Sequence, residues 1–215
     1  MISFLHTSAV HVATFDGVLD ELSPGMARQH RVEASWLARA REEGMTRQLE
    51  AEISDAMQEL AAGGVGVCTC STIGGVAEAA GTDAAPAIRI DRALMQAALE
   101  TGPQPLVAMC LDSTRAPTLE LLHEVAQSAS RDVSPIVVMC SGAWQHFEAG
   151  DMAAYASSIA GTITSALGTA RPDCIVLAQG SMAPAEPLLA DTGLPVLTSP
   201  RLGVLRALQL LDQKR

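Results

Sequence analysis

The stretch Gly64-Val65-Gly66-Val67-Cys68-Thr69-Cys70-Ser71-Thr72-Ile73-Gly74-Gly75 decides the fold of this chain. Its first part is a short apolar run typical of a buried strand, and its second part places a thiol and two hydroxyls directly before a helix start. In parallel α/β sheets, ligands bind beyond the carboxyl ends of the strands. A helix N-terminus also offers unpaired N–H groups that bind carboxylates and favour a thiolate. The stretch therefore predicts a reactive cysteine beside an anion site.

The rest of the chain alternates in the same way between short apolar runs and segments of helical periodicity. We expect strands at residues 2–5, 28–32, 64–70, 105–111, 135–139, 174–178 and 194–197. We expect helices at residues 10–22, 36–41, 47–62 (with Thr46 as N-cap), 73–80, 92–99 (with Asp91 as a candidate cap), 119–129, 152–167 and 202–211, and an extended connector at 84–90. Apolar strands separated by helices favour parallel sheets that are covered on both faces.

The two halves of the chain repeat the same order of elements. Phe4–Ser8 aligns with Cys110–Thr114, and Val67–Thr72 aligns with Val176–Ser181. This repeat predicts an α/β fold of two pseudo-symmetric lobes, each a mostly parallel sheet flanked by helices, with the active site in the cleft between the lobes. The expected lobes are residues 1–97 plus 198–215 and residues 98–197.

Composition excludes several classes of partner. The 215 residues carry a formal net charge of −10 without a basic run, so we expect no nucleic-acid partner. No apolar stretch approaches the roughly 20 residues that span a bilayer, so we expect no membrane partner. The start, Met1–His6, lacks the pattern of a signal peptide, and we expect a cytoplasmic protein. The five cysteines are expected to be reduced, and their spacing predicts no metal site.

The sequence Cys70-Ser71-Thr72 at a strand end, with a second strand-end loop in the other half of the chain, resembles the aspartate/glutamate racemase superfamily. That group includes glutamate, aspartate and hydantoin racemases, arylmalonate decarboxylase and maleate isomerase. The resemblance covers essentially the whole chain. It implies two lobes with the active site between them, no cofactor, and a small carboxylate or carbonyl substrate. It also implies one cysteine from each lobe, acting on opposite faces of the substrate carbon, and it leaves room for a homo-oligomer.

The second cysteine of the superfamily is missing from this chain. Where the family has Cys-Thr after an apolar strand, Cys174–Ala178 runs into Gln179-Gly180-Ser181. An amide cannot act as a base near neutral pH. Cys174 lies at the far end of the same strand and cannot replace the missing thiol. We therefore expect chemistry on one face of the substrate.

The candidate catalytic residues are Cys70, Gln179 and His6. Cys70 is the proposed proton-transfer or nucleophilic thiol, and its alternative role is that of a small core residue. Gln179 would orient the substrate, or else belong to an ordinary loop. His6 could replace the second base, or be inert. By resemblance, the candidate substrate-binding residues are Ser8, Ser71, Thr72, Ser113, Thr114, Gly180 and Ser181. Their hydroxyls could equally cap helices. We assign Cys68, Cys110 and Cys174 to the core and leave Cys140 open.

The sequence thus favours a cofactor-independent enzyme of this superfamily that acts on a small carboxylic acid or a related carbonyl compound. The expected reaction is of the isomerase, decarboxylase or lyase type. Two alternatives stay open. One is an amino-acid or hydantoin racemase with a non-cysteine second base, and the other is a non-catalytic protein that binds a small anion.

Overall fold

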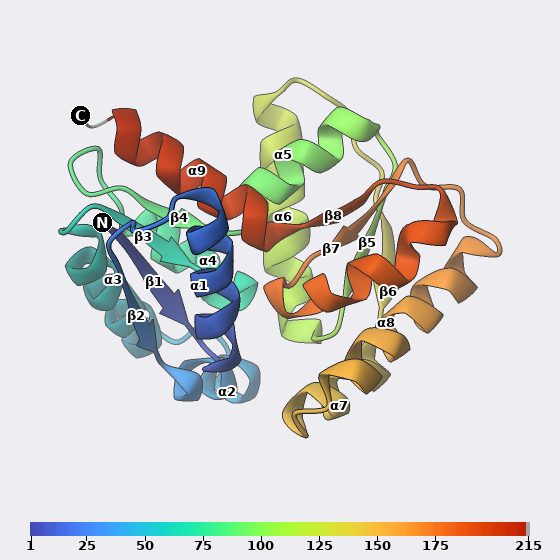
Figure 1. Ribbon diagram of the computed structural model, residues 1–215, viewed down its shortest axis with the longest axis horizontal. Coiled ribbons are helices and arrows are strands. Elements are labelled where there is room, and N and C mark those ends of the chain that lie inside the picture. The colour runs from blue at the N-terminus through green and yellow to red at the C-terminus, as the bar shows by residue number, and fades with distance from the viewer. Residues whose placement is uncertain (214–215) are drawn as a thin grey trace. The chain divides into compact units, whose positions relative to one another are not determined.

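The computed structural model describes residues 1–213, which fold into two compact units (Figure 1). Among the described residues, the first comprises Met1–Asp91 and residues 200–213, and the second comprises Arg92–Ser199. Each unit has a separate four-stranded sheet. The boundary that we expect after residue 97 falls inside α5 (Arg92–Thr101), which belongs to the second unit. Residues 214–215 of the expected first lobe lie outside the described residues.

The sheet of the first unit is parallel throughout, in the order β2-β1-β3-β4. Its strands are β1 (Ile2–His6), β2 (Arg28–Val32), β3 (Val65–Cys68) and β4 (Ala87–Arg89). Its helices are α1 (Val10–Leu22), α2 (Ala34–Glu43), α3 (Arg47–Ala61), α4 (Ser71–Ala79) and α9 (Ser199–Gln213).

Both faces of this sheet are buried, because successive side chains of a strand point to opposite faces. Leu5 packs in a cluster with α2, α3 and α4, whereas its neighbour Phe4 packs in a second cluster that includes α1 and α9. The expected N-cap of α3 is confirmed: the hydroxyl of Thr46 accepts a hydrogen bond from the backbone N–H of Leu49 at 3.3 Å. Helix α3 then presents one apolar side to the sheet.

The sheet of the second unit has the same order, β6-β5-β7-β8, and is also parallel. Its strands are β5 (Pro105–Met109), β6 (Ile136–Met139), β7 (Cys174–Leu177) and β8 (Val196–Thr198). Its helices are α5, α6 (Asp112–Ser128), α7 (Trp144–Glu148) and α8 (Met152–Leu167), with 3-10 segments η1 (Ser141–Ala143) and η2 (Gly180–Thr192).

Several elements differ from the expectation, including the following three. The connector at 84–90 contains β4, a short edge strand. Helix α6 begins at Asp112, seven residues before the expected start, and it tolerates Pro117 in its second turn at the cost of one backbone hydrogen bond. The segment after β7 is a 3-10 helix that contains two prolines, which the apolar periodicity does not reveal. Asp91 pairs with Arg89 at the end of β4.

The register of the two sheets identifies corresponding residues. In the first unit Leu5 pairs with Cys68, and in the second Ala108 pairs with Leu177. Cys68 therefore corresponds to Leu177, as we expect from the sequence repeat. The alignment of Phe4–Ser8 with Cys110–Thr114 is wrong by three residues, because the apolar run of the second unit continues beyond the end of β5.

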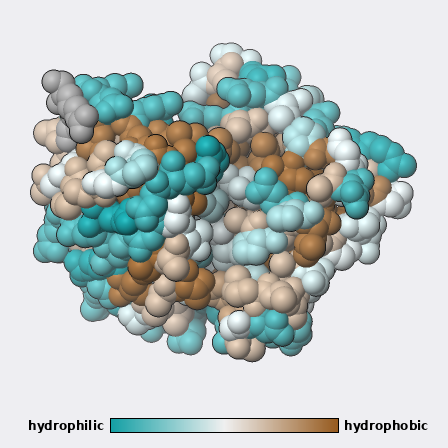
Figure 2. Space-filling model, viewed as in Figure 1, coloured by the Kyte–Doolittle hydropathy of each residue, from teal (hydrophilic) through white to brown (hydrophobic). Residues whose placement is uncertain are grey.

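The surface mixes hydrophilic and hydrophobic residues on the face shown in Figure 2. Large exposed hydrophobic side chains among the described residues are Met1, Val10, Val32, Leu188 and Leu205. In residues 1–213, no helix has both the length and the hydrophobicity that crossing a bilayer requires.

Candidate functional site

The candidate thiol lies at the carboxyl edge of the first sheet. Strands β1 and β3 are parallel neighbours, so His6 at the end of β1 and the residues after Cys68 reach the same edge. The backbone N–H of Thr69 donates to the carbonyl of Leu5 at 3.0 Å and fastens the two strand ends together. Cys70 follows as the N-cap residue of α4.

Exposure separates Cys70 from the other cysteines. Cys70 is half-buried, whereas Cys68, Cys110, Cys140 and Cys174 are buried. Burial raises the pKa of Cys110 to about 11 and that of Cys140 to about 12, and it also raises the pKa of Cys68 and Cys174. Buried thiols in such surroundings stay protonated and inert. Among the five cysteines, Cys70 is thus the one that is not buried.

Ser71 and Thr72 form the start of α4, where the helix dipole places partial positive charge. The carbonyl of Ser71 accepts a hydrogen bond from Arg89 at 3.4 Å. Arg89 is itself held by two bonds to the fully buried Asp91, at 2.7 and 2.9 Å. A buried ion pair therefore supports the first turn that follows Cys70.

His6 is fully buried, and both of its ring nitrogens have side-chain partners. Nδ1 lies 2.8 Å from the Thr69 hydroxyl, and Nε2 lies 2.8 Å from Nδ1 of His30. Burial, aided by repulsion from His11 and His30, lowers the pKa of His6 to about 3. Such a weakly basic ring, with both nitrogens occupied, is poorly suited to take a proton from a substrate. The geometry favours a positioning role instead of the second-base role.

Ser8 lies in the loop between β1 and α1 and is half-buried. Its carbonyl accepts the backbone N–H of His11 at 3.3 Å, which closes the turn into the helix. Because this loop leaves the sheet at the edge occupied by Cys70, Ser8 remains a candidate for binding a substrate carboxylate.

The second unit places Gln179 at the N-cap of η2, directly after β7. Oε1 of Gln179 accepts a hydrogen bond from the backbone N–H of Cys110 at 2.6 Å. This partner is a donor, so it fixes the orientation of the amide. The NH₂ group of Gln179 then forms the other end of the side chain. This end can donate hydrogen bonds to a carboxylate or carbonyl oxygen.

A buried polar cluster supports this second strand end. The hydroxyl of Tyr155, from α8, donates to the sulfur of Cys110 at 3.4 Å and lies 2.9 Å from the hydroxyl of Ser181. Burial raises the pKa of Tyr155, which keeps its hydroxyl protonated. Ser181 is therefore engaged inside the unit, while the backbone of Gly180 and Ser181 starts η2.

Ser113 and Thr114 lie in the first turn of α6, after the end of β5. Ser113 is half-buried and Thr114 is buried. They share the carboxyl edge of the second sheet with Gln179, since β5 and β7 are parallel neighbours. The structure thus gathers the candidates into one strand-end group in each unit.

Sequence reasoning missed several residues that hold these groups. Thr69, His30 and Asp16 form hydrogen bonds around His6, and Tyr155 and Cys110 do so around Gln179 and Ser181. For His30, the sequence predicts the strand that contains it, at residues 28–32. The pairing of that strand with β1, which places His30 opposite Phe4, is seen only in the structure. The others depend on long-range contacts that local patterns do not reveal.

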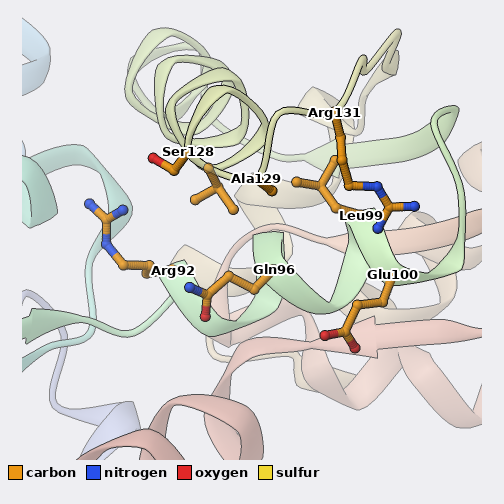
Figure 3. A pocket seen from close by; sticks show the side chains of 8 residues that line it. Arg92, Gln96, Leu99, Glu100, Ser128, Ala129 and Arg131 are labelled. Carbon is orange, nitrogen blue, oxygen red and sulfur yellow. The ribbon is translucent and has the colours of Figure 1, made fainter.

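A pocket of about 480 Å³ lies elsewhere in the second unit, between α5 and α6 (Figure 3). Its lining consists of Arg92, Gln96, Leu99, Glu100, Val125, Ser128, Ala129 and Arg131. Arg92 bonds with Glu124 at 2.9 Å. None of the candidate site residues lines this pocket. Among the described residues, no three His, Cys, Asp or Glu side chains are grouped to hold a metal ion.

Comparison with solved structures identifies the fold. Glutamate racemase from Francisella tularensis in complex with D-glutamate matches 99% of this chain and 81% of its own, with a TM-score of 0.76 and 11% identity. Allantoin racemase from Klebsiella pneumoniae matches 99% of this chain and 88% of its own, with a TM-score of 0.66 and 19% identity. A mutant of arylmalonate decarboxylase in a sulfate-associated form matches 100% and 94%, with a TM-score of 0.59 and 15% identity.

A scan against models of protein families finds no match, and a sequence search of curated proteins finds none either. The chain nevertheless has the fold of the aspartate/glutamate racemase superfamily, as the sequence resemblance predicts. Two parallel four-stranded sheets flanked by helices confirm the expected α/β architecture.

Proposed function

We propose that this protein is a cofactor-independent enzyme that acts on a small carboxylic acid or a related carbonyl compound, with Cys70 as its reacting thiol. The observation that carries the proposal is that a thiol and an amide occupy corresponding positions in the two units. Cys70 and Gln179 are the N-cap residues that follow β3 and β7. The first offers an accessible thiol, and the second offers amide N–H donors. Structural neighbours with this fold are racemases and a decarboxylase.

The residues suit different steps of one reaction. In this proposal a substrate carboxylate binds at the start of α4, beside Ser71 and Thr72. Gln179 donates to a second oxygen of the substrate. Donors aimed at an oxygen stabilise the negative charge that develops on it in the transition state. Cys70 then moves the proton.

Chemistry on one face is favoured because the second strand end offers an amide where racemisation needs a base. In a decarboxylation, the bond to the leaving carboxylate breaks, carbon dioxide departs, and the electron pair remains on the α-carbon as an enediolate. The thiol of Cys70 gives its proton to that carbon, and the resulting thiolate takes a proton from water. An isomerisation would use the same thiol without loss of carbon dioxide.

The experiment compares wild type, Cys70→Ser and Cys174→Ala on amino acids, allantoin and aryl-substituted malonates in deuterated water. We expect one deuterium at the α-carbon and a single enantiomer as product. Cys70→Ser should abolish this turnover, while Cys174→Ala, which removes a buried thiol at the amino end of β7, should keep it. Turnover by Cys70→Ser, or rapid racemisation by wild type, would contradict the proposal.

Alkylation distinguishes an enzyme from a protein that only binds a small anion. A catalytic Cys70 should react with iodoacetamide much faster than the four buried thiols at neutral pH. Small carboxylates that are substrates should protect it. Slow reaction at Cys70, with no protection by any carboxylate in the panel, would favour the non-catalytic alternative.

A further inference from the structure

A chain of side-chain hydrogen bonds in the first unit joins Thr69 to Asp16. The Thr69 hydroxyl lies 2.8 Å from Nδ1 of His6, and Nε2 of His6 lies 2.8 Å from Nδ1 of His30. Nε2 of His30 in turn lies 3.3 Å from Oδ1 of Asp16. One end of the chain is the residue directly before Cys70. The other end is a carboxylate on α1.

The carbonyl of Leu5 offers the Thr69 hydroxyl a second acceptor, and this sets one possible donor-to-acceptor direction for the series of hydrogen bonds. The Thr69 hydroxyl lies 3.2 Å from that carbonyl and has a single hydrogen to give. When the hydrogen goes to Leu5, Thr69 must accept from Nδ1–H of His6. Nε2 of neutral His6 then accepts from Nδ1–H of His30. Because a carboxylate only accepts, His30 must also carry a hydrogen on Nε2 toward Asp16, so it is a doubly protonated cation.

When His30 is neutral, the hydrogen bonds between Thr69 and Asp16 can run in a second consistent direction. Neutral His30 keeps its hydrogen on Nε2 toward Asp16, so its Nδ1 becomes an acceptor. His6 then donates from Nε2–H, and its Nδ1 accepts the hydrogen of Thr69. The bond from the Thr69 hydroxyl to Leu5 is lost in this state. His6 is neutral in both states, but its hydrogen lies on opposite nitrogens.

We propose that His30 is a positioning residue for Cys70: when His30 takes up one proton beside Asp16, the hydrogen bonds through His6 reverse and the Thr69 hydroxyl turns from His6 to the carbonyl of Leu5. The inference deepens the proposed function and rests on it in one respect, namely that Cys70 is the reacting thiol. In the protonated state, the residue before Cys70 is bound to Leu5 through both its N–H and its hydroxyl. In the neutral state, it keeps the N–H bond alone.

Solvent exposure differs along this series of hydrogen bonds, and it is greatest at the Asp16 end. The exposed fraction of the side chain is 37% for Asp16 and 14% for His30, whereas His6 has no exposed surface. Phe4 stacks on the ring of His30 with centroids 5.1 Å apart, and Phe15 lies 5.6 Å from the ring of His6. Apolar rings therefore shield His6 from water, and His30 and Asp16 have the larger exposed surface.

Charged and titratable groups from several helices and strands lie near this series of hydrogen bonds. From β2, Arg28 lies 2.6 Å from the same oxygen of Asp16 and also bonds Asp20 at 2.6 Å. From α1, the ring of His11 lies 6.1 Å from that of His6. Arg28 opposes the uptake of a proton by His30, and Asp16 and Asp20 favour it.

The first measurement is the tautomer of His6, read from ¹⁵N chemical shifts of histidine-labelled protein from about pH 5 to about pH 9, a range that brackets ordinary histidine titration. We expect the hydrogen of His6 on Nδ1 at the acidic end and on Nε2 at the alkaline end. His30→Gln should remove the change. Asp16→Asn should move it to lower pH. His123→Gln, which alters an exposed helical histidine, should leave it as in wild type.

The second measurement is the rate at which iodoacetamide alkylates Cys70, relative to its thiolate fraction at each pH. Because one neutral hydrogen bond is gained or lost, we expect this rate to change by about threefold to tenfold across the His6 transition. His30→Gln and Thr69→Val should remove the step, and Thr69→Ser should retain it. These readouts need no substrate.

Each result has a definite meaning. A His6 tautomer that is the same at all pH values, or a doubly protonated His6 in this range, would overturn the inference. A tautomer change without a step in Cys70 alkylation would overturn the positioning role. If both measurements behave as expected but Cys70→Ser retains turnover, the switch stands and the proposed function fails.

Discussion

Cys70 and Gln179 occupy the same place in their respective sheets. Each lies two residues beyond a strand residue that pairs with the central strand, Cys68 in one unit and Leu177 in the other. Their backbones are also alike, with φ and ψ of −111° and 117° for Cys70 and of −107° and 138° for Gln179. One scaffold position thus carries a thiol in the first unit and an amide in the second.

The first prediction is that Gln179→Cys introduces racemisation. A second thiol at the corresponding strand end would supply the base that two-sided proton transfer requires. General acid–base catalysis typically contributes about 10²–10⁴-fold, so the gain should be readily measured as loss of optical rotation. The control is Gln179→Ser, because its hydroxyl is similar in size to the thiol of Gln179→Cys but much less acidic. A racemisation rate no higher than that of wild type would argue against the assigned role of this position.

The second prediction concerns Gln179→Glu. The carboxylate would keep an acceptor for the backbone N–H of Cys110 but lose the amide donors. It would also place a negative charge beside an anionic substrate, where like charges cost several kcal/mol. We expect KM for a carboxylate substrate to rise by at least about tenfold, with the fold intact by circular dichroism. An unchanged KM would show that Gln179 does not donate to the substrate.

The third prediction is a loss of stability in mild acid. Burial lowers the pKa of His6 to about 3 and that of His11 to about 4, below the ordinary 6.5 that the unfolded chain restores. Well above pH 6.5, both histidines are neutral in the folded and in the unfolded protein. As pH falls below that value, the unfolded chain binds protons first, so the free energy of unfolding decreases, by at most roughly 1.4 kcal/mol per pH unit for each histidine. Below their folded-state pKa values, this loss levels off.

Urea unfolding at several pH values between about 7.5 and 5 measures this slope, since carboxylates titrate little there. His11→Phe removes one of the two groups and should make the slope shallower. His146→Gln, which alters a partly exposed residue at the end of α7, should not. Equal slopes in wild type and His11→Phe would contradict the prediction.

The fourth prediction concerns the buried ion pair of Arg89 and Asp91. Asp91→Asn would leave the Arg89 guanidinium buried without its counter-charge, which costs about 3–5 kcal/mol of unfolding free energy. Because Arg89 also bonds the carbonyl of Ser71, the start of α4 should loosen. The exposed pair of Arg201 and Glu21 is the control, and Glu21→Gln should cost less than about 1 kcal/mol. Similar losses for both variants in urea unfolding would contradict this account.

Much of the fold follows from local patterns. The helix over Val10–Leu22 is predicted to the residue, because apolar periodicity and turn residues bound it. The strand over Arg28–Val32 is also predicted to the residue, although Val32 is its one apolar residue. The start of α6 is not, because Pro117 reads as a helix boundary although the preceding turn is helical. The edge strand β4 is also missed, since three residues are too few for a periodic signal.

The candidate site is predictable only where it follows the strand ends. Cys70 and Gln179 stand at chain positions that the alternation of strand and helix identifies. The partners of His6 and Ser181 cannot be found that way. Tyr155 and Ser181 are 26 residues apart, and His6 and Thr69 are 63 apart. Such contacts depend on the register of the sheet and on helix packing, which a single sequence does not determine.

The return of the chain to its first unit has a consequence for biosynthesis. Val204 and Ala207 of α9 are fully buried in the cluster that holds Phe4 and Phe15. A ribosome makes the whole of Arg92–Ser199 before it makes these residues. Until α9 emerges, α1 alone covers this face of the first sheet, and the cluster around Phe4 and Phe15 is incomplete. The second unit, which is one continuous segment, can complete its own core earlier and is the part expected to fold first during translation.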